Sequence, residues 1–164
     1  MVQIEQRLTE LGLRLPDRCD PRGNFLPYVI SQKLVFMAGQ VCEWNGDLPY
    51  QGPVLSETQQ APDGLGTIDI ATSYKAAEIC ALNLLFHLRN ACEGDFARVK
   101  RIVRVGGYVN CLPGFDRSPA VINGASDLLI KLFGESGRHA RTAVGVAGLP
   151  ANASVEVDAV FALN

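Results

Sequence analysis

The sequence predicts an α+β fold in which a mixed β-sheet carries two long helices on one face. Segments rich in β-branched and aromatic residues outnumber the helical segments. Two segments place apolar residues three and four positions apart over a length that can cover one sheet face. A chain of 164 residues, 48% of them hydrophobic, can bury a full core without disulfides or metals. We therefore expect residues 1–164 to form a single domain with its helices on one side of the sheet.

The first 22 residues are expected to extend this domain at its N-terminus as a helix and a loop. Apolar residues recur at intervals of four and three within residues 2–11, and Gly12 suits the position after a helix end. Residues 16–23 are rich in Pro, Asp and Gly, a composition typical of loops.

Two short strands are expected next, over residues 26–31 and 33–41, where β-prone residues are dense. The dipeptide Asn45-Gly46 indicates a hairpin, because both central residues of a type I′ turn have positive φ. This turn predicts that residues 47–54 return as a further strand.

The first long helix is expected over residues 69–91, after a polar loop at 56–67. It is the longest periodic stretch, no proline interrupts it, and either Thr67 or Asp69 can cap its start. A second helix is expected over residues 118–133, with a proline in its first turn, where the missing N–H costs nothing.

The remaining strands are expected over residues 99–110, 141–148 and 154–163, and the last two are expected to pair. The first of them has apolar residues on both faces, and Gly106-Gly107 within it predicts a bulge or a close backbone approach. The two helices can cover only one face of this sheet. Apolar residues on both faces favour burial of the other face by another subunit.

The charge and hydropathy of the chain argue against two classes, nucleic-acid-binding proteins with a strongly basic face and membrane-spanning proteins. The chain has 15 basic and 17 acidic side chains, so its net charge of −2 does not favour a strongly basic nucleic-acid-binding face. The strongest basic cluster, Arg98, Lys100, Arg101 and Arg104, is expected on a solvated strand edge or helix exit. No apolar run approaches the roughly 20 residues of a membrane span, and no signal peptide is expected, which favours the cytoplasm.

The five cysteines and two histidines lack the spacing of a disulfide framework or a metal site. The cysteine count is odd, no C-x-x-C occurs, and the histidines form no H-x-x-x-H or H-E-x-x-H motif. Cys80 and Cys92 lie in an apolar helical pattern and are expected in the core. We expect neither a metal nor another cofactor.

A candidate pair of functional residues lies near the C-terminus. Arg141 enters an apolar strand, and an arginine there can bind a small carboxylate through two parallel hydrogen bonds. Glu156 lies in the strand expected to pair with it and can hold or activate a water. Taken alone, this pattern favours a structural ion pair at a sheet edge over a catalytic site.

Six segments resemble, in order and roughly in spacing, the RidA (YjgF) family of enamine/imine deaminases. The resemblance covers about residues 23–160, and its closing segments are the most specific. The N-terminal helix and the longer loop at 52–67 resemble the branch labelled putative endoribonuclease or chorismate-mutase-like. The segments are Gly23-Asn24-Phe25, Phe36-Met37-Ala38-Gly39-Gln40, Val109-Asn110 with Phe115, Val121-Ile122-Asn123, Ala140-Arg141-Thr142-Ala143-Val144 with Leu149-Pro150, and Val155-Glu156-Val157-Asp158-Ala159-Val160.

The resemblance implies a chorismate-mutase-like domain that assembles as a homotrimer with three clefts between subunits. Members hydrolyse reactive enamines and imines, released by pyridoxal-phosphate enzymes, to 2-keto acids and ammonia, and they need no cofactor. Arg141 corresponds to the arginine that binds the substrate carboxylate, and Glu156 to the acidic residue that positions water. Asn123, Gly39 and Phe25 correspond to lining positions.

Three positions depart from the family pattern. Phe25 lacks the hydroxyl of the usual tyrosine, Ala143 stands where many members carry cysteine, and Ala38 replaces a common serine. A less polar pocket predicts a more apolar substrate or the loss of deaminase turnover. The alternative function is a non-catalytic small-molecule-binding or chaperone-like trimer. An endoribonuclease ranks third, because the sequence shows neither a histidine pair nor a basic groove.

Overall fold

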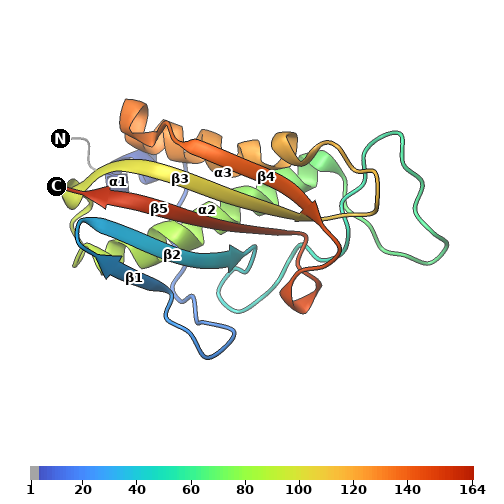
Figure 1. The fold of residues 1–164 in the computed structure, drawn as a ribbon, viewed down its shortest axis with the longest axis horizontal. Helices are drawn as coiled ribbons and strands as arrows, with labels where there is room; N and C mark the ends of the chain where they lie inside the picture. The colour runs from blue at the N-terminus through green and yellow to red at the C-terminus, as the bar shows by residue number, and fades with distance from the viewer. Residues whose placement is uncertain (1–3) are drawn as a thin grey trace.

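The computed structural model describes residues 4–164 and contains a five-stranded sheet in the order β1–β2–β5–β3–β4 (Figure 1). Strands β3 and β4 run parallel, whereas the other neighbours are antiparallel, so the predicted mixed sheet is confirmed. The strands are β1 (Tyr28–Ser31), β2 (Leu34–Val41), β3 (Val99–Asn110), β4 (Ala140–Val146) and β5 (Val155–Leu163).

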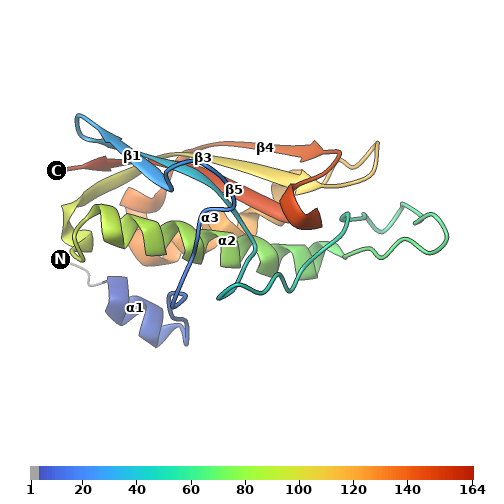
Figure 2. The same ribbon diagram turned by 90° about the horizontal axis from the view of Figure 1, so that it is seen from below.

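The two long helices, α2 (Ile70–Ala91) and α3 (Ser118–Phe133), cover one face of the sheet (Figure 2). The short helix α1 (Ile4–Glu10) lies on their far side, away from the sheet, and buries Ile4 and Leu8. None of the helices within residues 4–164 is long and apolar enough to cross a membrane. Three 3-10 turns complete the described secondary structure: Phe96–Arg98, Gly134–Gly137 and Pro150–Asn152.

The helix ends follow the capping chemistry of the sequence. Asp69, one of the two predicted caps, accepts a hydrogen bond from the Thr72 N–H at 2.7 Å and so begins α2. Pro119 lies in the first turn of α3. Gly134 ends that helix with a φ of 61°, a left-handed conformation that glycine adopts without a steric penalty.

The predicted close approach at Gly106-Gly107 is confirmed. A Cβ on Gly107 would lie 2.5 Å from the Ile122 side chain of α3, and one on Gly106 would lie 2.6 Å from the Asp158 carboxylate. These glycines therefore let α3 pack directly on the sheet and let Asp158 lie across β3. The irregularities of β3 occur elsewhere, between Val99 and Arg101 and between Ile102 and Arg104.

The prediction of a strand over residues 47–54 is wrong. The turn itself forms, since Asn45 and Gly46 have φ of 55° and 99°, and Trp44 and Asp47 exchange backbone hydrogen bonds of 2.7 and 3.1 Å. Beyond the turn the segment makes only isolated bridges. The physical reason is that both edges of β2 are already paired, one with β1 and the other with β5.

The predicted pairing of the last two strands is also wrong. Strand β5 lies between β2 and β3, and β4 pairs with the far edge of β3. Helix α3 connects β3 to β4, so these two strands form a parallel crossover unit and leave β5 on the other side.

The sheet face opposite the helices carries a mixed apolar and charged surface in a single chain. Phe36 lies between the buried residues of β2 and so faces away from the helices, with 46% of its surface exposed. Val29, its partner on β1, is 52% exposed, and Val144 on β4 is 40% exposed. Between them, the Asp158 carboxylate accepts hydrogen bonds from the Tyr108 hydroxyl at 2.8 Å and from Arg104 at 3.2 Å.

Candidate functional site

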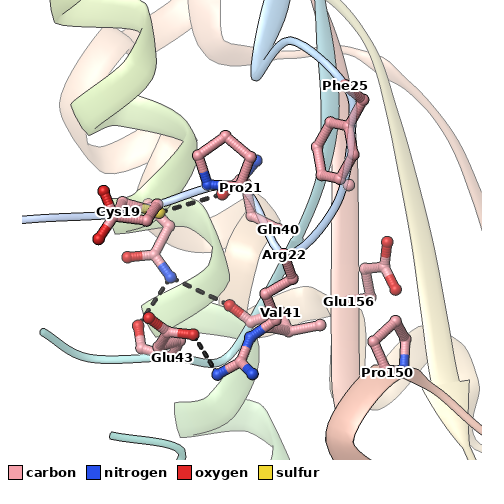
Figure 3. Close-up of a pocket in the computed structure, with 12 residues that line it drawn as sticks. Cys19, Pro21, Arg22, Phe25, Gln40, Val41, Glu43, Pro150 and Glu156 are labelled. Carbon is pink, nitrogen blue, oxygen red and sulfur yellow. Dashed lines mark hydrogen bonds and ion pairs between the residues drawn. The ribbon is translucent and has the colours of Figure 1, made fainter. Parts of the chain in front are cut away.

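A pocket of about 200 Å³ opens at the edge of β2, beyond the end of the short strand β1. The N-terminal loop, the end of β2, helix α2 and the start of β5 all contribute to its wall. Three predicted site residues, Phe25, Gly39 and Glu156, line it together. In Figure 3 the Phe25 ring and the Glu156 carboxylate border the same side of the pocket, with Pro150 beside the carboxylate.

The Glu156 carboxylate lies directly over Gly39. A Cβ on that glycine would lie 1.9 Å from Glu156 Oε1, so only glycine leaves room for this side chain. Gly39 lies where the register of β2 against β5 shifts, between Met37 and Gln40. No hydrogen bond to the Glu156 carboxylate is found among residues 4–164. Burial, and secondly the charge of Asp158, raise the pKa of Glu156 above its ordinary value.

The inner wall of the pocket is held by an asparagine of α2. The Asn83 side-chain N–H₂ donates to the carbonyls of Val41 and Glu43 at 3.0 and 2.7 Å, and its buried Oδ1 has no partner within residues 4–164. The Cys19 thiol donates to Gln40 Oε1 at 3.1 Å. Burial, followed by the charge of Glu43, raises the pKa of Cys19 to about 12, so this thiol is not an activated nucleophile.

An ion pair between the N-terminal loop and Glu43 also lines the pocket. The Arg22 guanidinium contacts the Glu43 carboxylate, and the two side chains lie among the labelled residues of Figure 3. The pocket therefore combines one paired arginine with the unpaired carboxylate of Glu156.

The other predicted site residues lie at the opposite edge of the sheet, where β4 meets α3. The Arg141 guanidinium donates from Nη1 to Asn123 Oδ1 at 2.9 Å and to Ser126 Oγ at 3.0 Å, and from Nη2 to the Pro119 carbonyl at 3.3 Å. Ala143 lies two residues further along the same face of β4. Arg141 and Asn123 line a shallow depression on this edge.

Arg141 and Glu156 do not form a pair within one chain, contrary to the sequence prediction. Arg141 is in register with the buried Val105, so it lies on the helix-covered face of the sheet. Glu156 is in register with Tyr108 and lies between buried neighbours on β5, so it occupies the opposite face. Strand β3 separates the two residues, and the six predicted site residues therefore form two groups of three.

The cysteines and the basic cluster contribute to packing and local pairing. Cys80 and Cys92 are buried in the core as predicted, and all five cysteines are free. Arg98 pairs with Glu93 at 3.1 Å, and Arg101 donates to the Arg138 carbonyl at 2.9 Å. Within residues 4–164, no group of three or more His, Cys, Asp or Glu side chains is gathered as a metal site requires.

Sequence reasoning did not single out Asn83, Arg22 or Ser126 as site residues. Asn83 and Ser126 lie within helical periodicity, and their partners are 40 and 15 residues away in the chain, at Glu43 and Arg141. Arg22 lies in a segment predicted only as a loop. The one available signal was a polar residue within the apolar pattern of a buried helix, which applies to Asn83 and Ser126.

The chain is similar to known proteins over nearly its whole length. The model of the "YjgF/chorismate mutase-like, putative endoribonuclease" family matches residues 5–163. Protein TCP17 of Trypanosoma cruzi is 40% identical over 164 residues, which cover 99% of this chain and 95% of the relative.

Solved structures with a similar fold also cover nearly the whole chain. The protein Atu1372 from Agrobacterium tumefaciens is 39% identical with a TM-score of 0.85, over 98% of this chain and 92% of that one. A putative endoribonuclease from Shewanella oneidensis is 32% identical with a TM-score of 0.85, over 98% and 99%. RidA from an Antarctic Psychrobacter, at 20% identity and a TM-score of 0.55 over 91% and 94%, shares the fold.

Proposed function

Because this chain belongs to the YjgF/chorismate mutase-like, putative endoribonuclease family, we propose that it hydrolyses reactive enamines and imines to 2-keto acids and ammonia. The reaction takes place without a cofactor in clefts between the subunits of a homotrimer. One observation carries the proposal. Within residues 4–164, a half-buried carboxylate without a hydrogen-bond donor lines a pocket, while an arginine with unused N–H groups lies at the opposite edge of the same sheet.

The separation of the two groups supports a site built from two copies of the chain. Glu156, Gly39 and Phe25 of one subunit would face Arg141, Asn123 and Ala143 of its neighbour. The uncovered sheet face supports the same arrangement, because exposed Phe36 and Val29 would be buried by assembly. A cyclic trimer repeats such a heterologous contact three times and closes.

The reaction requires mainly that the protein position the substrate and a water molecule. Arg141 binds the substrate carboxylate, and Glu156 holds a water against the imine carbon. As the water oxygen bonds to that carbon, Glu156 accepts one of its protons and returns it to the nitrogen. The carbinolamine that forms then gives up its hydroxyl proton, which Glu156 transfers to the nitrogen as the C–N bond breaks, and this leaves a 2-keto acid and ammonia. An enamine first takes a proton on its terminal carbon and loses one from its nitrogen, and so becomes the imine. General acid–base help of this kind contributes about 10²–10⁴-fold.

The pocket wall favours substrates with an apolar side chain. Phe25 is 48% exposed and lines the pocket without a hydroxyl, and Ala143 gives the neighbouring wall no thiol. A tyrosine hydroxyl or a cysteine thiol in a closed cleft needs a polar partner. This chain carries neither group at positions 25 and 143, so its cleft does not require such a partner.

A coupled assay with freshly generated 2-aminoacrylate tests the proposal. We expect release of pyruvate and ammonia above the uncatalysed rate, unchanged by EDTA and by removal of pyridoxal phosphate. Glu156→Gln is expected to lose at least about 10²-fold in kcat. Absence of turnover together with binding of 2-keto acids would instead support the non-catalytic binding trimer. Loss of turnover on chelation, restored by a metal, would contradict the cofactor-free mechanism.

A further inference from the structure

Polar groups at the junction of α3 and β4 form one continuous hydrogen-bonded chain that ends on Arg141. His139 Nδ1 lies 2.6 Å from the Gly137 carbonyl oxygen, and His139 Nε2 lies 3.0 Å from Ser126 Oγ. Ser126 Oγ in turn lies 3.0 Å from Arg141 Nη1. Ser126 is only 7% exposed, so water has little access to the middle of the chain.

The Gly137 carbonyl, at the end of this hydrogen-bonded chain opposite Arg141, determines which group donates in each bond. A carbonyl oxygen only accepts, so His139 Nδ1 carries a proton and donates to Gly137. Burial, and also the charge of Arg141, lower the pKa of His139, although the bond to Gly137 opposes them. The neutral ring leaves Nε2 as an acceptor for the Ser126 hydroxyl. The Ser126 oxygen is then free to accept the N–H of Arg141.

The contacts of Arg141 leave a defined edge of the guanidinium for a ligand. Nη1 uses both of its N–H groups, on Asn123 and Ser126, and Nη2 uses one on the Pro119 carbonyl. An arginine has five N–H groups, and the Nε–H and one Nη2–H of Arg141 make no hydrogen bond to residues 4–164. Nε and Nη2 border the same edge of the guanidinium, and such an edge can receive both oxygens of a carboxylate.

The charged neighbours of this junction are engaged elsewhere. Asp127 accepts the Tyr74 hydroxyl at 2.8 Å, and Arg138 donates to Glu135 at 3.0 Å. Within residues 4–164, neither forms a hydrogen bond or ion pair with the Arg141 guanidinium, although both line the same depression. Its orientation therefore depends on Asn123, the Pro119 carbonyl and the Ser126 hydroxyl, and the last is itself oriented by His139.

We infer that His139 and Ser126 are positioning residues, which hold the Arg141 guanidinium with its Nε–Nη2 edge directed at the substrate carboxylate. This inference deepens the proposed function and rests on it for the identity of the ligand. His139 and Ser126 themselves do not touch the substrate. They act on its affinity by keeping the arginine in one orientation before the substrate binds.

Binding of 2-oxobutanoate, measured by calorimetry, tests the inference. We expect Ser126→Ala to weaken binding about tenfold, because a hydrogen bond to a charged group is lost. The imine KM should rise by a similar factor, whereas kcat should stay within about twofold, since the reacting atoms are untouched. Ser126→Thr keeps the hydroxyl and should restore affinity. The matched control is Ser118→Ala, a buried serine on the same helix, which should change nothing.

A double-mutant cycle separates a relay through Arg141 from a general structural role. In the Arg141→Ala background, Ser126→Ala should have no further effect on affinity, because the residue through which it acts is absent. Additive losses, or a lowered melting temperature with unchanged affinity, would overturn the inference. His139→Ala provides a second variant with the same expected pattern if Ser126→Ala fails to fold. Binding of 2-oxobutanoate without any turnover would refute the proposed function and leave this inference standing. Failure of the parent protein to bind 2-oxobutanoate would overturn the inference.

Nitrogen NMR of the histidine rings tests the geometry without any ligand. We expect the His139 ring in the Nδ1–H form, assigned by loss of its signals in His139→Gln. An Nε2–H ring would overturn the inference, because the Ser126 hydroxyl could not then donate to it.

Discussion

At Gly39, the missing side chain makes room for the Glu156 carboxylate in the pocket. A Cβ there would lie 1.9 Å from Glu156 Oε1, so we expect Gly39→Ala to displace the carboxylate and lower kcat about 10²-fold. Gly148→Ala is the control, because nothing lies within 4 Å of its Cβ position. Equal activity of the two variants in the 2-aminoacrylate assay would show that the position of Glu156 does not matter.

Glu156 also sets an expected pH dependence. Burial first, and then the charge of Asp158, raise its pKa, and the proposed role needs the charged form. Activity should therefore fall as the pH falls through this raised pKa. Asp158→Asn removes the second cause, so the pKa should drop and the acidic limb of the rate profile should move to lower pH. Tyr108→Phe removes a hydrogen bond to Asp158 but keeps its charge, and should leave the limb in place.

The residues at the wall of the site are expected to set substrate preference. Phe25→Tyr combined with Ala143→Cys restores two polar groups, and an unpaired one costs about 1–3 kcal/mol in a closed cleft. We expect the preference for the imine of leucine over that of serine to fall by one or two orders of magnitude in kcat/KM, on the order of that free energy. An unchanged ratio of the two rates would mean that these positions do not contact the side chain.

The sequence singled out candidate site residues only where a local pattern or the family resemblance marked them. Gly39, Arg141 and Glu156 lie in segments that resemble the family, and each lies in a strand that β-prone composition predicted. Ser126 could not be found in this way, because its partners, Arg141 and His139, are 15 and 13 residues further along the chain. Only tertiary packing brings them together.

At the scale of elements, periodicity was a reliable guide and pairing was not. Helices α2 and α3 form where apolar spacing and caps predicted them. Residues 47–54 look like a returning strand because their turn is correct, but β1 and β5 already occupy both edges of β2. Strand order depends on which edges remain free, and local sequence does not encode this property.

The N-terminal helix is expected to stabilise the domain through one arginine. Arg7 Nη1 donates to the Leu132 and Lys131 carbonyls at 2.7 and 3.2 Å, at the end of α3, where helix carbonyls lack partners. Arg7→Ala should lower the free energy of unfolding by about 1–2 kcal/mol in urea titrations. Arg89→Ala, which removes an exposed 3.9 Å pair with Glu5, should lower it by less than about 1 kcal/mol. Equal losses would mean that the contact with α3 contributes nothing specific.

At the scale of the whole molecule, the fold keeps the two halves of the proposed site apart within one chain. The sheet places Glu156 on one face and Arg141 on the other, with β3 between them. The same sheet leaves Phe36 and Val29 exposed on the face that the helices do not cover. Assembly would therefore bury apolar surface and complete the site in one step, and sedimentation should show a trimer at micromolar concentration.

Complementation between two inactive variants tests this composite site directly. Glu156→Gln lacks the carboxylate half and Arg141→Ala lacks the guanidinium half, so each homotrimer should be inactive. When the two are unfolded, mixed in equal amounts and refolded, one cleft in four pairs two intact halves. Activity should then return to about one quarter of the parent value. The control is Arg89→Ala mixed with Arg141→Ala, since Arg89 is an exposed residue of α2 that lines neither the Glu156 pocket nor the Arg141 depression. Here half of the clefts should be active. No recovery in the first mixture, at a confirmed trimeric mass, would show that Glu156 and Arg141 of neighbouring subunits do not share a cleft.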